Sequence, residues 1–138
     1  MGTHFRPRVP RHELSKALNS FLQKGTLPEQ VIRLMLAGQL KEVRSLLEQV
    51  LAIDPNDTIA HFNMGSILRN LGDLQGSLEH YQHCEKIFDD IGNFYTNRAR
   101  TYEALGQKDK VIADYKKALE LMPGDLFTLK RLEELESA

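Results

Sequence analysis

The residues of this chain best suited to hold a metal ion are His80, His83 and Cys84. The two histidines are three positions apart, so a helix would place them on one face, and imidazole with thiolate is a ligand set that zinc and copper favour. The repeat described below, however, puts Cys84 in an inward-facing column and both histidines in columns that also hold polar residues. We therefore interpret Cys84 as a small core residue and expect no metal and no other cofactor.

No arrangement of residues typical of an enzyme stands out in the sequence. There is no serine, histidine and aspartate set of the hydrolase kind, no glycine-rich phosphate loop and no isolated pair of carboxylates. The carboxylates at Asp89 and Asp90, and those from Asp109 to Asp114, are expected on solvated turns and helix faces. We predict that the protein is not an enzyme.

The elements that carry these residues follow a fixed period, since glycine recurs at equal intervals, at Gly38, Gly72 and Gly106. The residues around the glycines repeat with them, without insertion, over 24–57, 58–91 and 92–125. Such self-similarity indicates stacked units, each of which buries its apolar face against its neighbours. The chain is therefore predicted to be a solenoid.

Each unit contains two amphipathic stretches separated by its glycine, which is expected to end a helix at a positive φ. No stretch alternates with period two, so we predict an all-α fold with two helices in each unit. Equivalent positions on the inner faces are apolar or small: Leu34, Leu68 and Tyr102; Val43, Ser77 and Val111; Leu47, Tyr81 and Tyr115; Val50, Cys84 and Ala118; Ile53, Ile87 and Leu121.

This spacing resembles the tetratricopeptide repeat, whose pattern is W-x2-L-G-x2-Y, then A-x3-F, then P. The matches are His61, Met64, Gly65, Leu68, Ser77 and Tyr81 in the second unit, Tyr95, Arg98, Ala99, Tyr102, Val111, Tyr115 and Pro123 in the third, and Leu27, Val31, Leu34, Val43, Leu47 and Pro55 in the first. The resemblance implies a right-handed superhelical α-solenoid. Arg98 takes a place that is usually apolar, so it must either reach solvent or pair with a carboxylate.

Segments outside the three units are predicted to cover the two ends of the stack. Four leucines at helical spacing, with charged residues between them, predict a capping helix over 126–138: Leu126, Leu129, Leu132 and Leu135. An amphipathic stripe predicts an N-terminal helix over 12–24. Residues 1–11 contain several arginines and two prolines with little to bury, so we expect a disordered basic arm there.

The resemblance implies that the first helix of each unit lines a concave groove, in which an asparagine often binds a peptide backbone. Asn63 and Asn97 stand at that place, one full repeat apart, and should stack on one wall. An amide side chain both donates and accepts hydrogen bonds, as a peptide unit does. The pair predicts a clamp on an extended peptide, and the alternative is that each amide bonds a neighbouring helix.

Seven further residues are predicted to line this groove: Phe62, Ser66, Arg69, Asn70, Arg100, Lys130 and Arg131. Their cations, with Glu103 among few carboxylates, favour an acidic peptide or a terminal carboxylate as partner, and the alternative is a solvated charged face. Family members that grip an acidic chaperone tail use two lysines, two asparagines and an arginine. Here only Asn97 and Arg131 fit that clamp, beside Phe62, Ser66 and Phe127, and we reject it.

In the first unit the groove side is apolar, at Ile32, Met35 and Leu36. These side chains need cover from the N-terminal helix, a partner or a second copy, so they are candidates for self-association or helix docking. The stretch 21–26 is similar to the secretion chaperones, which hold a substrate segment and dimerise. We predict a protein interaction scaffold that binds a peptide, with a secretion-type or assembly chaperone as the alternative.

Composition excludes several classes of partner. The 138 residues carry a net charge of −1, so no overall field attracts nucleic acid or an anionic membrane. There is no apolar run of about 18 residues and no secretory signal. We expect a cytoplasmic protein that is a monomer or a weak homodimer.

Overall fold

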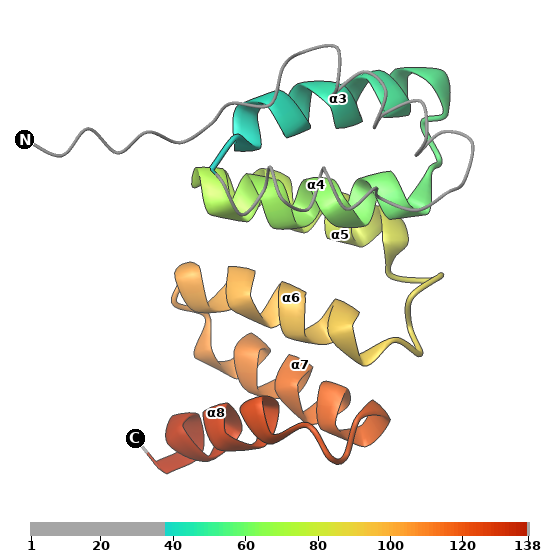
Figure 1. The fold of residues 1–138 in the computed structure, drawn as a ribbon. Coiled ribbons are helices and arrows are strands. Elements are labelled where there is room, and N and C mark those ends of the chain that lie inside the picture. The colour runs from blue at the N-terminus through green and yellow to red at the C-terminus, as the bar shows by residue number, and fades with distance from the viewer. Residues whose placement is uncertain (1–37, 138) are drawn as a thin grey trace, which may run out of the picture.

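The computed structural model describes residues 38–137, and this part of the chain forms six helices and no strand. The helices are α3 (Leu40–Ile53), α4 (Thr58–Leu71), α5 (Leu74–Cys84), α6 (Gly92–Ala104), α7 (Lys108–Leu121) and α8 (Leu126–Ser137). They follow one another as antiparallel rods along one direction, from α3 to α8 (Figure 1). The predicted basic arm over 1–11, the helix over 12–24 and the first helix of the first unit lie outside the described residues.

The predicted glycine turns are confirmed, because Gly38, Gly72 and Gly106 have φ values of 82°, 93° and 73°. After α4, the Gly72 N–H donates to the carbonyl of Arg69 at 3.1 Å, and the left-handed residue turns the chain back at once. The next helix then starts directly at its cap, where the side chain of Asp73 accepts from the N–H of Gly76 at 2.9 Å. The second unit therefore folds as a tight helical hairpin of α4 and α5.

Within residues 38–137 the apolar core is divided into three clusters along the stack. Val43, Leu47, Val50, Ala60, Met64, Ile67 and Leu68 join α3 to α4. Tyr81, Cys84, Phe94, Tyr95 and Ala118 join α5 to α6 and α7, and Ala99, Val111, Tyr115 and Leu132 join α6 and α7 to α8. Each cluster uses neighbouring helices only, which is the packing expected of an array of repeats.

A close approach between α4 and α5 depends on Gly65. A Cβ atom at this position would lie 2.5 Å from Cε1 of Tyr81, which is fully buried. The equivalent residue of the third unit is Ala99, also fully buried. The small residue in this column therefore lets the second helix of a unit pack against the first.

Two expectations about the inner faces are wrong, since Ile53 is 70% exposed and Ile87 is 62% exposed. Helix α5 has 11 residues, whereas α3 and α7 have 14. Because α5 ends at Cys84, Ile87 lies beyond the helix and no longer continues its apolar stripe. Ile53 is the last residue of α3, where the chain turns toward α4.

The capping helix α8 uses a different face from the predicted one. Leu132 is buried as expected, but Leu126 and Leu129 are 77% and 41% exposed. Thr128 is buried one turn before Leu132, and its hydroxyl donates to the carboxylate of Asp125. The packed face therefore runs through Thr128 and Leu132, and the leucine stripe is only partly in the core. None of the helices within residues 38–137 is both long enough and apolar enough to cross a membrane.

Candidate functional site

The first helices of successive units, with the capping helix, are linked in the order α4, α6, α8. Nη1 of Arg69 on α4 donates to the backbone carbonyl of Asn97 on α6 at 2.9 Å. On α8, Nε and Nη2 of Arg131 donate to the two carboxylate oxygens of Glu103 on α6, at 3.1 and 3.0 Å. We call the polar side chains along these three helices the first-helix surface: Asn63, Arg69, Asn70, Asn97, Arg100, Lys130 and Arg131.

Asn63 and Asn97 have the same local geometry. Nδ2 of Asn63 donates to the carbonyl of Ile59 at 2.9 Å, and Nδ2 of Asn97 donates to that of Asn93 at 2.7 Å. Both bonds reach one turn back along the same helix, so neither amide bonds a neighbouring helix through them. Asn70 makes a third bond of this kind, to the carbonyl of Ser66 at 2.8 Å.

Two of the predicted groove residues lie in the packing between helices. The Oγ of Ser66 is 3.0 Å from the hydroxyl oxygen of Tyr81, and both residues are buried. Phe62 is half-buried, with its ring tilted against Tyr81 and edge-on to Phe88. Ser66 and Phe62 therefore contact the core between α4 and α5. The longer polar residues of the first-helix surface, and not these two, are the ones that a ligand could reach.

The cations of the first-helix surface differ in how far they are already neutralised. Arg131 donates to both oxygens of Glu103, and its Nη1 donates to Glu134 at 3.0 Å. Burial by itself would raise the pKa of Glu103, but hydrogen bonds from Arg131 and from the hydroxyl of Tyr115 hold that pKa below its ordinary value. Glu103 is therefore ionised, and Arg131 is committed to holding α8 on α6.

Arg69, Arg100 and Lys130 have no carboxylate partner among residues 38–137. Arg69 is half-buried and donates to a backbone carbonyl. Burial lowers its pKa, but the guanidinium stays charged at neutral pH. The Cζ of Arg100 lies 5.3 Å from the ring centroid of Phe127. Arg100 and Lys130 are exposed, so they remain available to an acidic group.

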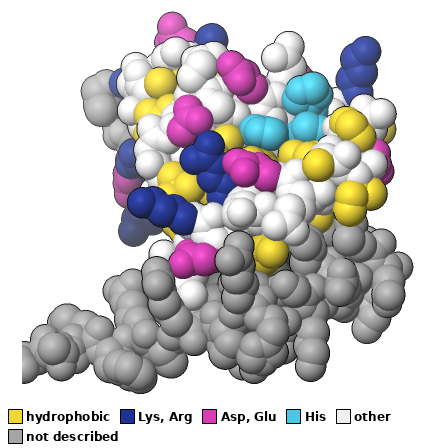
Figure 2. Space-filling model, turned by 90° about the horizontal axis from the view of Figure 1, so that it is seen from above, with side chains coloured by type: hydrophobic (Ala, Val, Ile, Leu, Met, Phe, Trp, Pro, Cys, Tyr) yellow, Lys and Arg dark blue, Asp and Glu magenta, His cyan; other side chains and the backbone are white. Residues whose placement is uncertain are grey.

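A group of histidines was missed from the sequence, because His61 and His80 are distant in the chain and lie on different helices. Nε2 of His61 is 2.7 Å from the carbonyl oxygen of Pro55, to which it must donate. The ring of His83 stacks on that of His61, with centroids 4.4 Å apart. Figure 2 shows histidine side chains gathered at one place on the surface.

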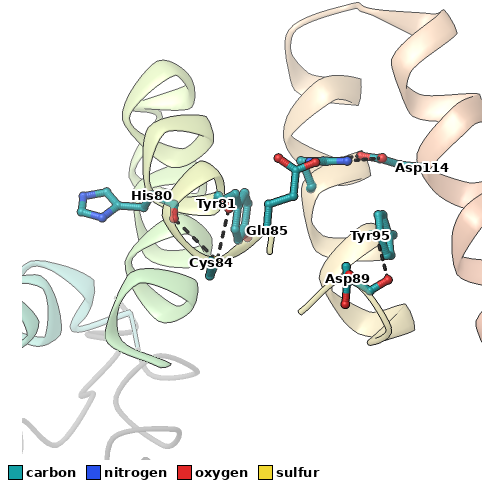
Figure 3. A network of polar contacts seen from close by, with 8 residues as sticks. His80, Tyr81, Cys84, Glu85, Asp89, Tyr95 and Asp114 are labelled. Atoms are coloured by element: carbon teal, nitrogen blue, oxygen red, sulfur yellow. Dashed lines mark hydrogen bonds and ion pairs between the residues drawn. The ribbon is translucent and has the colours of Figure 1, made fainter. Parts of the chain in front are cut away.

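Cys84 lies in the core, as predicted. Its thiol is buried and donates to the carbonyls of Tyr81 and His80, while His80 points away from it (Figure 3). Burial raises the pKa of Cys84 to about 11, so the thiol stays protonated. Within residues 38–137 no three histidine, cysteine or acidic side chains are arranged to hold a metal ion.

Arg98 pairs with carboxylates, which decides the question that the sequence left open. Its Nε and Nη2 donate to the two oxygens of Asp114 at 2.9 and 2.8 Å, and its Nη1 lies 3.0 Å from Oε1 of Glu85. Asp114 is only 5% exposed, so the expectation of a solvated carboxylate there is wrong. Figure 3 shows Glu85, the residue after α5, and Asp114 of α7 reaching toward the same contact from opposite sides.

The guanidinium of Arg98 is also surrounded by aromatic rings. Its Cζ lies 5.1, 5.6 and 5.8 Å from the ring centroids of Phe94, Tyr95 and Tyr102. Burial disfavours the charged form, but the bonds to Asp114 outweigh it and raise the pKa of Arg98. The arginine therefore stays charged in a mostly buried position.

Comparison with known proteins identifies the family. Two models of the tetratricopeptide repeat match the sequence, one at residues 92–125, in register with the predicted third unit, and one at 46–79. No curated protein sequence matches significantly. Together with the helical stack, these matches show that the chain is a tetratricopeptide repeat protein, and its fold is an all-α repeat solenoid.

Several solved structures of low sequence identity have a similar fold. The first such domain of Spaghetti (RPAP3), bound to the HSP90 peptide SRMEEVD, has a TM-score of 0.72 and 16% identity, over 89% of this chain and 93% of that one. The first domain of human RPAP3 has a TM-score of 0.70 and 17% identity, over 79% and 86%. MamA from Desulfovibrio magneticus RS-1 has a TM-score of 0.74 and 17% identity, over 92% and 75%.

The matches to the tetratricopeptide repeat support a protein–protein interaction module. Ile32, Met35 and Leu36, which carry the alternative of a self-associating chaperone, lie outside the described residues.

Proposed function

We propose that the protein is a non-catalytic cytoplasmic scaffold whose first-helix surface binds an extended segment of a partner protein. Asn63 and Asn97 would grip the backbone of that segment. The observation that carries the proposal is the identical anchoring of the two amides, each by one N–H to its own helix, on helices that Arg69 ties together. Each amide keeps an oxygen and a second N–H to offer a peptide unit.

Charge on the same surface supports a partner segment with acidic residues. Arg131 is paired with Glu103 and Glu134, so we assign the acidic contacts to Arg100 and Lys130. The similar domain of Spaghetti was solved with a peptide from HSP90, which supports a peptide ligand for this fold. We do not extend that particular ligand to this chain, because three clamp positions hold Phe62, Ser66 and Phe127.

The test begins with a peptide selected from a random library on the wild-type chain. We expect Asn63→Ala with Asn97→Ala to weaken its binding at least about tenfold, with the melting temperature nearly unchanged because alanine favours a helix. N-methylation of the peptide backbone opposite the amides should weaken binding comparably. It removes the peptide N–H groups that would donate hydrogen bonds to the asparagine side-chain oxygens.

The control is Gln49→Ala, which removes an exposed amide from α3, outside the first-helix surface. Its affinity should equal that of the wild type. Unchanged affinity in the double asparagine variant would exclude the backbone clamp.

A further inference from the structure

A cleft with a volume of about 460 Å³ lies between α5 and the pair α6 and α7, and none of its lining residues belongs to the first-helix surface. Its charged and aromatic lining consists of Glu79, Glu85, Arg98, Tyr102, Lys110 and Asp114. The α5 side carries the two glutamates, and the α7 side carries Lys110. The cleft is therefore separate from the first-helix surface and has its own chemistry.

The buried ion pair of Arg98 and Asp114 forms part of the cleft wall, where folding alone does not require one. In the second unit the equivalent positions hold Met64 and His80, and in the first unit the position equivalent to Asp114 holds Leu46, so no such ion pair stands there. Replacing a buried ion pair by apolar residues of similar size is often neutral or stabilising. The apolar residues avoid the free-energy cost of removing two charges from water. A polar wall at this one junction therefore calls for a reason other than stability.

The hydrogen-bonding capacity of the cleft favours a donor as its ligand. Arg98 turns the paired edge of its guanidinium to Asp114 and a third nitrogen to Glu85, so no edge is left for a second bidentate carboxylate. Glu85 uses one oxygen in this contact, and its side chain is 49% exposed. Glu79 is exposed and makes no ion pair within the described part of the chain. Acceptors therefore remain on the α5 side.

The ring of Tyr102 forms an aromatic part of the cleft wall that already attracts cations. The Nζ of Lys110 lies 5.4 Å from its ring centroid and the Cζ of Arg98 lies 5.8 Å from it. The cleft also contains three carboxylates against two cations, which gives it a negative balance. We propose that it binds an arginine or lysine side chain of a partner protein, held by Glu79 and Glu85 with its aliphatic stem near Tyr102.

The test uses the full isotope-labelled chain and four capped pentapeptides, Gly-Gly-X-Gly-Gly, in which X is arginine, lysine, glutamate or leucine. The arginine and lysine peptides should cause saturable amide shifts within residues 75–85 and 98–114, and added salt should weaken them because the attraction is electrostatic. The glutamate and leucine peptides should not. Equal shifts with all four peptides, or none with arginine and lysine, would overturn the proposal.

Matched variants test the assignment to the α5 glutamates. Glu79→Gln with Glu85→Gln should weaken binding of the arginine peptide about tenfold, while both side chains keep their size. Glu48→Gln is the control, since Glu48 lines a separate cleft of about 500 Å³ beside α3. The double variant Asn63→Ala, Asn97→Ala should bind the arginine peptide normally, which separates this site from the first-helix surface. An undiminished affinity in the double glutamine variant would refute the assignment.

Discussion

His61 and His80 meet through their Nδ1 atoms, 2.9 Å apart, and a single proton lies between α4 and α5 at this contact. The carbonyl of Pro55 requires a proton on Nε2 of His61, so Nδ1 of a neutral His61 is an acceptor and His80 is the donor. A second proton on His80, at its Nε2, would leave this hydrogen bond in place, but it would put a charge on a partly buried ring beside His61 and His83. The stability of this junction therefore depends on pH.

The first prediction is that acid destabilises the fold through His80. Burial, and then the neighbouring His61 and His83, lower the pKa of His80, against the opposing effects of Glu79 and Asp73. In the unfolded chain histidine titrates at about 6.5, so below that pH the unfolded state binds more protons and stability falls. Urea midpoints at about pH 7.5 and about pH 5.5 should show this loss. The loss of stability should be smaller in His80→Leu, because leucine does not titrate. Leucine also occurs at the equivalent position of the first unit, as Leu46. An equal loss in both proteins would contradict this.

The second prediction concerns Arg98 and Asp114. Arg98→Met leaves the carboxylate of Asp114 buried and unpaired, so we expect a loss of about 3–5 kcal/mol. Adding Asp114→Leu should recover most of this, because both residues then match those of equivalent positions in other units. Urea unfolding of the single and double variants measures the coupling. A double variant as unstable as the single one would show that the pair is needed for packing.

The third prediction concerns Gly65. The ring of Tyr81 occupies the space that a Cβ atom at this position would need. Gly65→Ala therefore overpacks the contact between α4 and α5 and should lower the free energy of unfolding by about 1–3 kcal/mol. Gly124→Ala is the control, since a Cβ there meets nothing within 4 Å, and its effect should stay within about 0.5 kcal/mol. Thermal unfolding compares them. Similar melting temperatures for the two variants would mean that α5 moves aside at no cost.

The repeat could be predicted from the sequence because it is a one-dimensional property. The constant interval between the glycines determines where helices end, and Gly72 and Gly106 need no partner to adopt a positive φ. The same alignment failed at Ile87, since the length of α5 depends on local turn residues and not on the period. It also failed at Asp114, whose column holds Leu46 and His80 and gives no sign of a buried charge.

The candidate sites were predictable only where one column carried them. Asn63 and Asn97 occupy one column, so their repetition could be read from the sequence, although the bond of each to its own helix could not. The contact of His61 with His80 and that of Arg98 with Glu85 join different columns of different helices. Such pairs follow from the three-dimensional stacking of helices, for which a single sequence contains no direct signal.

The last prediction concerns the junction between the second and third units. Oγ of Ser77 on α5 and Oγ1 of Thr101 on α6 are 2.9 Å apart, and both residues are fully buried. Ser77→Ala leaves the buried Thr101 hydroxyl without its hydrogen-bond partner, and Thr101→Val does the same to the Ser77 hydroxyl. Each variant should therefore lose about 1–3 kcal/mol of unfolding free energy. The double variant should cost less than the sum, because no hydroxyl is then left without its partner. Urea unfolding of all four proteins completes the cycle, and strictly additive losses would show that this bond does not couple the two units.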